Sequence, residues 1–322
     1  MKTVLALLLF MAGVGSFNAA GAQDYPNKAI RLMVPFSPGG GTDLQARTIS
    51  QELNEAWGQP VIVDHRPGAT GAVASNIVLQ SPADGYTIFI VTSSTHAISP
   101  NLFRDPPYNP VKDFDAVTQT ATAPEIICSH PSVPVRSVQQ LIDLAKAQPG
   151  KLNYASPGTG SIGHMTAELF KHLTGTQIVG VPYKGSGAAV RELVGGQVEV
   201  MFSAPGAVIS YVRAGRLRAL GVLAAERTPV LKEVPTLAEL GYPQIDASNW
   251  YGFLVRSGTP RPIINKLAKE IARIVEQPKV RALLLRQGYT VKTSSPEAFA
   301  AHMRKEFEKW GKVVRDTGMG LK

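Results

Sequence analysis

Short apolar runs alternate with helical patterns along most of this chain, and this alternation strongly restricts the fold. Near the start, strands are predicted at 30–34, 61–63 and 87–91, with helical spacing at 42–57 and 72–79 between them. A repeated order of strand, helix and strand implies a parallel sheet with helices on its faces. The sequence therefore predicts an α/β fold.

One long extended stretch interrupts the alternation, which then begins again. Residues 116–127 read as a strand that crosses between lobes, and residues 250–255 read as the return crossing. A chain of this length usually exceeds what one hydrophobic core supports. We expect lobe 1 to comprise residues 23–123 and 247–322, and lobe 2 to comprise residues 124–246. Two crossings make a hinge, which is typical of a protein that closes on a ligand.

The first 22 residues have the pattern of a secretory signal peptide. Lys2 precedes an apolar stretch from Val4 to Val14, and Ala20-Gly21-Ala22 matches the A-x-A type of cleavage site. The apolar stretch is too short and wrongly flanked for a stable membrane span. We therefore expect cleavage after Ala22 and a periplasmic location.

Composition excludes several kinds of partner. The net charge is +9, but the basic residues are spread out or mixed with acids on the C-terminal helices, as on a solvated helix face. We therefore expect no nucleic-acid partner. Cys128 is the only cysteine and lies in an apolar run, where a buried core role is expected. The six histidines are scattered, so we predict no metal site. We also predict no cofactor, and we expect a monomer.

Two glycine-rich turns of similar design lie far apart in the sequence, at 34–43 and 154–164. Each follows a short apolar run and precedes a helical pattern. Glycines let backbone N–H groups point at a ligand, and a helix N-terminus adds partial positive charge. One turn in each lobe suggests two jaws that hold the same anion.

Candidate ligand-binding residues follow from these turns and from the strand ends. The turns supply Phe36, Ser37, Gly39, Gly40, Thr42, Asp43, Ser156, Thr159, Gly160, Ser161 and His164. Ligands bind beyond the carboxyl ends of strands in open α/β sheets, which adds Ser93, Thr95, His96, Tyr183 and Lys184. Other roles stay open. Asp43 can stabilise the helix dipole, and His164 and Tyr183 can be packing residues.

Two catalytic or cofactor interpretations of the second turn are weak. Gly158-x-Gly160-x-x-Gly163 matches a dinucleotide fingerprint, but the acid expected about 20 residues on is missing. Ser161 and His164 could form part of a hydrolase site, yet the first glycine of a nucleophile elbow is absent. We favour Ser161 as a helix cap and assign no catalytic residue.

The motifs taken together resemble the substrate-binding proteins of the tripartite tricarboxylate transporter family, also called the Bug family. In family order, the matching motifs are Pro35-Phe36 with Gly39-Gly40 and Asp43; Arg66-Pro67-Gly68-Ala69-x-Gly71; Pro82-x-Asp84-Gly85-Tyr86-Thr87; Tyr154-x-Ser156-x-Gly158-x-Gly160-Ser161 with His164; Val181-Pro182-Tyr183-Lys184-Gly185; Arg218-Ala219-Leu220; Val234-Pro235-Thr236-Leu237 with Glu239 and Gly241-Tyr242-Pro243; and Trp250-x-Gly252 before Gly258-Thr259-Pro260. This ordered set spans essentially all of the chain after residue 22.

The resemblance implies a type II periplasmic binding fold of two α/β lobes with a ligand cleft between them. It also implies that backbone amides of the two turns hold a carboxylate, often through ordered waters. After the strand at 198–202 this chain has Ser203 and Ala204, where some relatives carry an Asp that binds an ammonium group. We add Ser203 and Ala204 to the candidates and expect a mono- or dicarboxylate without an amine.

The function expected from the sequence is therefore capture of a small organic carboxylate for membrane transporter subunits. Two alternatives remain: a ligand-sensing receptor that signals to a partner protein, and an exported serine hydrolase that uses Ser161.

Overall fold

Strands and helices alternate in the first part of the chain, as the sequence pattern predicts. The structure is a computed structural model that describes residues 25–245 and 247–319, so the expected signal peptide lies outside the described residues. The first elements are β1 (Ile30–Val34), α2 (Gly41–Trp57), β2 (Val61–His65), η1 (Ala69–Gly71), α3 (Ala72–Gln80), β3 (Thr87–Thr92), the π-helical turn η2 (Ser94–Ile98), α4 (Ser99–Leu102) and β4 (Phe114–Ser129).

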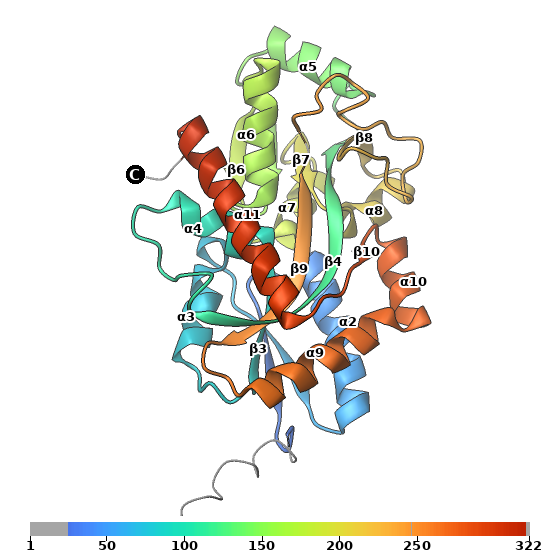
Figure 1. The fold of residues 1–322 in the computed structure, drawn as a ribbon. Coiled ribbons are helices and arrows are strands. Elements are labelled where there is room, and N and C mark those ends of the chain that lie inside the picture. Colours follow the sequence, from blue (N-terminus) through green and yellow to red (C-terminus); the bar gives the residue numbers. More distant parts are fainter. Residues whose placement is uncertain (1–24, 246, 320–322) are drawn as a thin grey trace, which may run out of the picture.

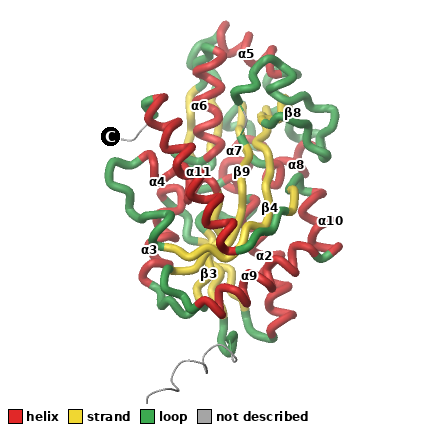
Figure 2. The backbone as a smooth tube through the Cα atoms, in the orientation of Figure 1, coloured by secondary structure: helices red, strands yellow, loops and turns green. Residues whose placement is uncertain are grey.

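A second α/β series follows β4. It comprises α5 (Val138–Ala147), β5 (Asn153–Ser156), α6 (Ile162–Thr174), β6 (Val179–Pro182), α7 (Ser186–Val194), β7 (Val200–Ser203), α8 (Pro205–Arg213) and β8 (Arg218–Leu223). The chain then returns through β9 (Ser248–Arg256) and ends with α9 (Arg261–Glu276), α10 (Pro278–Arg286), β10 (Thr290–Val291) and α11 (Pro296–Thr317). Figures 1 and 2 show the two series at opposite ends of the molecule, joined by β4 and β9.

The two long strands β4 and β9 connect the two lobes. The strand order is β2-β1-β3-β9-β4-β7-β5-β6, with β8 and β10 also paired to β4. From Phe114 to Pro124, β4 pairs antiparallel with β9; from Glu125 to Ser129 it pairs with β8, and over its last four residues also with β7. The chain thus leaves one lobe and re-enters it, which confirms the predicted two-lobe α/β fold.

The core of lobe 1 explains why its segments form these elements. All of β1 except Arg31 is buried, and the run from Ile88 to Thr92 in β3 is fully buried, as expected for parallel strands covered on both faces. On α9, Ile263, Leu267 and Ile271 form an apolar stripe at helical spacing that faces the core of lobe 1. Among the described residues, no helix is both long and apolar enough to cross a membrane.

Helix α11 is the element that covers the crossing strands. Figure 1 shows it running diagonally in front of β9 and β4. The Phe299 ring packs edge-on against the Trp250 ring of β9, and a Cβ on Gly252 would come within 2.3 Å of the same phenyl ring. The C-terminal helix therefore fits closely against the strands that form the hinge.

Candidate functional site

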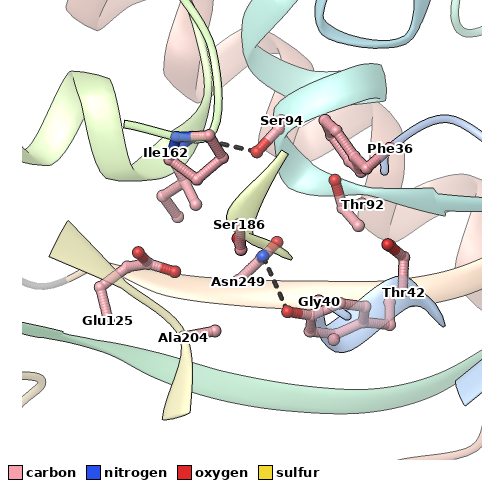
Figure 3. Close-up of a pocket in the computed structure, with 13 residues that line it drawn as sticks. Phe36, Gly40, Thr42, Thr92, Ser94, Glu125, Ile162, Ser186, Ala204 and Asn249 are labelled. Atoms are coloured by element: carbon pink, nitrogen blue, oxygen red, sulfur yellow. Dashed lines mark hydrogen bonds between the residues drawn. The ribbon is translucent and has the colours of Figure 1, made fainter. Parts of the chain in front are cut away.

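A partly open cavity lies between the lobes, where the two sheets meet. About 30 Å³ of it can be occupied by the centre of a water molecule, within about 390 Å³ of empty space that includes open solvent. The residues that line it are Phe36, Gly40, Gly41, Thr42, Thr92, Ser94, Glu125, Pro157, Ile162, Ser186, Ala204, Asn249 and Tyr251. Figure 3 shows side chains from both lobes and from both crossing strands pointing toward this space. The cavity is therefore the candidate ligand site.

Four helices begin at this cavity. Gly41 and Thr42 open α2 in lobe 1, while Ile162 and Ser186 open α6 and α7 in lobe 2. Ala204 is the N-cap residue of α8, whose first position is Pro205. The first N–H groups of a helix lack intrahelical acceptors, and the helix dipole places partial positive charge there. The arrangement favours a negatively charged group in the cavity.

The cavity contains very little charge of its own. Of the residues that line it, only Glu125 and Tyr251 can ionise, and none is Lys, Arg or His. Burial raises the pKa of Glu125 to about 8 and raises the pKa of Tyr251 well above its ordinary value. At neutral pH both groups are therefore mostly neutral, and an anion here would be held by backbone and hydroxyl donors rather than by a cation.

Direct contacts join the two lobes beside the cavity. The Ser37 N–H donates to the Lys184 carbonyl at 2.9 Å, and the Ile162 N–H donates to Ser94 Oγ at 3.0 Å. Thr70 Oγ1 donates to the Thr159 carbonyl at 2.6 Å. A Cβ on Gly187 would lie 1.9 Å from the Pro38 carbonyl oxygen, so only glycine allows this approach. These contacts hold the two lobes against each other.

Four of the residues predicted from the sequence line the cavity: Phe36, Gly40, Thr42 and Ala204. They come from the first glycine turn and from the start of α8. Their positions in the cavity follow from the topology. The first glycine turn follows β1 and Ala204 follows β7, and each lies at the carboxyl end of a parallel strand.

Asp43 is engaged in holding the first turn together. Its Oδ2 accepts from the Gly39 N–H at 2.9 Å, and its Oδ1 lies 2.8 Å from both Arg47 Nε and His65 Nε2. Gly39 itself has a φ of 90°, in the left-handed region that favours glycine. Asp43, Gly39 and Ser37 therefore shape the turn, and none of the three lines the cavity.

The second turn is held by its own polar groups. Ser161 is the N-cap of α6, and its Oγ accepts from the His164 N–H at 3.2 Å. The Gly160 N–H donates to His164 Nδ1 at 3.3 Å. Burial is the largest cause that lowers the pKa of His164, so its ring acts as a neutral acceptor. Ser161, His164 and Gly160 thus position the start of α6 rather than line the cavity.

Three other predicted residues line a second hollow, which Phe36 also borders. Thr159, Tyr183 and Lys184 line this hollow together with residues 68–70, and it has about 580 Å³ of empty space, open solvent included. Phe36 borders both spaces. The hollow lies at the line of contact between the lobes, because it includes both partners of the Thr70–Thr159 hydrogen bond.

The predicted residues after β3 lie behind the cavity wall. Ser93 Oγ donates to Asn249 Oδ1 at 2.6 Å, and Thr95 Oγ1 bonds the backbone of Thr92 at 3.1 Å. His96 is fully buried against the rings of Phe89, Tyr108 and Phe114, and burial lowers its pKa to about 3. His96 is thus placed as a neutral core residue of lobe 1.

Ser156 and Ser203 are also buried without lining the cavity. Ser156 Oγ has no hydrogen-bond partner in the described part of the chain, and Ser203 Oγ makes a long bond of 3.4 Å to the Ala204 carbonyl. Both are the last residues of their strands, β5 and β7, directly before the turns that reach the cavity.

Sequence reasoning missed the other cavity residues: Gly41, Thr92, Ser94, Glu125, Pro157, Ile162, Ser186, Asn249 and Tyr251. One signal was available. Glu125 is the only charged residue between 116 and 129, in a stretch otherwise suited to a buried strand. The choice between Ser93 and Ser94 had no such signal, because the π-helical turn that sets their directions has no sequence signature.

The chain is similar to known proteins over most of its length. The family model described as "Tripartite tricarboxylate transporter family receptor" matches residues 45–319. The protein BugT of Bordetella pertussis is 36% identical over 324 residues, which cover 100% of this chain and 99% of BugT.

Two similar solved structures contain small acids. Rpa4515 of R. palustris, solved with adipate, is 36% identical with a TM-score of 0.88, and the match covers 92% of this chain and 99% of that one. MatC of Rhodopseudomonas palustris, solved with bound malate, is 31% identical with a TM-score of 0.86, and the match covers 90% and 100% of the two chains.

Proposed function

Because this chain belongs to the tripartite tricarboxylate transporter receptor family, we propose that it is a periplasmic solute-binding protein for a small organic carboxylate. The ligand is enclosed between the two lobes, and the closed protein presents it to membrane transporter subunits. The acids named with Rpa4515 and MatC support this class of ligand.

The observation that carries the proposal is the meeting of four helix N-termini around a cavity without a basic side chain. Oriented N–H groups bind carboxylate oxygens through charge-assisted hydrogen bonds. Dipoles also avoid burying a second full charge, whose desolvation can exceed the gain from the ion pair. Such a site retains an anion when the lobes close and can release it when they open.

Closure of the lobes on the ligand can couple binding to transport. Contacts such as that between the Ile162 N–H and Ser94 Oγ join atoms of different lobes beside the cavity. A ligand that touches both lobes stabilises the closed form by its differential affinity for that form. The transporter subunits can then distinguish loaded from empty protein by the relative position of the lobes.

The experiment is a thermal-shift panel of mono-, di- and tricarboxylates, together with native mass spectrometry of protein purified without refolding. A carboxylate that binds only the native state raises the melting temperature, with about 2.7 kcal/mol of stabilisation at a concentration 100 times its Kd. If no carboxylate raises the melting temperature and no anion is carried through purification, the proposal is wrong.

Ala204→Asp tests the anion site directly. Asp is a favoured N-cap, so α8 keeps its stability, while a carboxylate placed at the cavity repels an anionic ligand. We expect the thermal shift to disappear in Ala204→Asp. Gln277→Asp at the N-cap of α10 is the matched control, because Gln277 does not line the cavity, and it should retain the full shift.

A further inference from the structure

Glu125 lies where β4 passes from one lobe to the other. Its neighbour Pro124 is paired with Ser248 of β9, whereas Glu125 itself is paired with Leu223 of β8. The residue is 1% exposed, and it lines the cavity. Figure 3 shows its carboxyl group on the side of the cavity opposite Thr42 and Thr92. A ligand whose near end lies at the start of α2 would therefore direct its far end toward Glu125.

The carboxyl group of Glu125 has no partner among the described residues that would satisfy it. Its Oε2 is buried without a hydrogen bond. The nearby polar groups bond one another, because Ser93 donates to Asn249 and Asn249 Nδ2 donates to the Tyr251 hydroxyl at 3.1 Å. A buried polar group without a hydrogen-bond partner destabilises the fold. We therefore expect the ligand to supply the hydrogen-bond partner of the Glu125 carboxyl group.

The surroundings of Glu125 keep it neutral. Among the described residues, Tyr251 on β9, Tyr289 before β10 and Cys128 on β4 itself interact electrostatically with Glu125. Burial raises the pKa of each of these three groups, so all are neutral below pH 9. Burial also raises the pKa of Glu125 to about 8. Below that pH its carboxyl group keeps its proton and can donate a hydrogen bond.

We propose that Glu125 is the specificity residue for the far end of the ligand, where its protonated carboxyl group donates a hydrogen bond to an acceptor oxygen. This inference rests on the proposed carboxylate-receptor function. It defines the ligand class as carboxylates with a second acceptor group, of which dicarboxylates are the simplest. It also predicts weaker binding of ligands with an ammonium group at the far end, because a protonated Glu125 offers them no charged partner.

The test uses three probe acids that differ only at the far end: adipate, hexanoate and 6-aminohexanoate, together with the matching four- and five-carbon sets. Calorimetry should show that a dicarboxylate binds more tightly than its monocarboxylate and ω-amino counterparts. Between pH 7 and pH 9 its affinity should fall about tenfold, because binding requires the protonated form of a group with a pKa near 8.

Glu125→Gln tests whether Glu125 acts as a neutral hydrogen-bond donor or as a charged partner of the ligand. The Gln amide can still donate, so the variant should bind the dicarboxylate within a few-fold of wild type and lose the pH dependence. Glu52→Gln is the control, since Glu52 is buried on α2 but lies outside the cavity and pairs with Lys279 at 2.7 Å. This control should retain the fall in affinity between pH 7 and pH 9.

The ligand-free protein gives a second measurement. Because the pKa of Glu125 is raised in the folded state, the native protein retains a proton that the unfolded chain releases at lower pH. Stability should fall as pH rises from about 5 to 8, and this part of the slope should be missing in Glu125→Gln. Urea unfolding at several pH values measures it.

The outcomes separate the two proposals. If no carboxylate binds at all, the receptor function is wrong and the role of Glu125 falls with it. If a dicarboxylate binds but its affinity is independent of pH, or if Glu125→Gln abolishes binding, only the role of Glu125 is wrong. Tighter binding of an ω-amino acid, or a native ligand without a far-end acceptor, also overturns this role while leaving the receptor function intact.

Discussion

Thr70 combines a strained backbone with a contact between the lobes. Its φ of 46° and that of Ala69, 42°, lie in the left-handed region, which non-glycine residues rarely adopt. Its hydroxyl donates to the Thr159 carbonyl in the other lobe at 2.6 Å. Strain of this kind persists only where the surrounding structure holds it. The interlobe hydrogen bond is therefore part of what fixes this turn, and Thr70 connects turn geometry to closure.

Thr70→Val removes this hydrogen bond while preserving the shape of the side chain. Loss of about 1 kcal/mol from the closed form lowers ligand affinity about fivefold, mainly through faster dissociation. Stopped-flow dissociation of a carboxylate ligand measures the effect. Thr48→Val is the control, because Thr48 donates to Leu44 within α2 and does not contact lobe 2. Equal dissociation rates for Thr70→Val and wild type would show that this bond does not hold the lobes together.

Helix α6 depends on a buried cap at its start. Ser161 is 1% exposed, and its Oγ accepts from the His164 N–H at 3.2 Å. Ser137 caps α5 with the same geometry, since its Oγ accepts from the Gln140 N–H at 3.2 Å, but it is only half-buried. Water can replace the lost partner at α5 more easily than at α6, so the two caps should contribute differently.

Ser161→Ala should destabilise the protein by about 2 kcal/mol, and Ser137→Ala by about 1 kcal/mol. Urea unfolding of both variants measures the difference. A loss in Ser137→Ala as large as that in Ser161→Ala would contradict the role of burial at α6.

The local patterns predict most elements but not the directions of individual side chains in the cavity. The predicted strand at 30–34 coincides with β1, and the predicted helix at 42–57 differs from α2 by one residue, because glycine caps and apolar periodicity are local signals. The short elements η2, α4 and β10 were not predicted. Thr92 and Ser94 line the cavity, whereas Ser93 lies behind it, and this depends on how a π-helical turn packs. Tertiary packing of this kind produces no periodic pattern of residues in the sequence.

The two crossing strands make the molecule a hinged unit. Every residue of β4 from Ala116 to Ser129, except Thr122 and Pro124, is buried, and this strand pairs with β9 on one side of Pro124 and with β8 beyond it. Cavity residues Glu125, Asn249 and Tyr251 lie on these same strands. A ligand that contacts them therefore touches the hinge as well as the lobes, so binding and the stability of the entire fold are linked.

Cys128 on β4 can report this linkage because it is the only cysteine of the chain. Burial raises the pKa of its thiol to about 12, so the folded protein presents almost no thiolate at neutral pH. Reaction with a thiol reagent should require opening of the fold, and a carboxylate at 100 times its Kd should slow it about 100-fold. An exposed cysteine, Ser132→Cys in a Cys128→Ala background, should react at a rate that the ligand does not change. If Cys128 is labelled equally fast with and without ligand, β4 opens locally without release of the ligand. The hinge is then not coupled to the site.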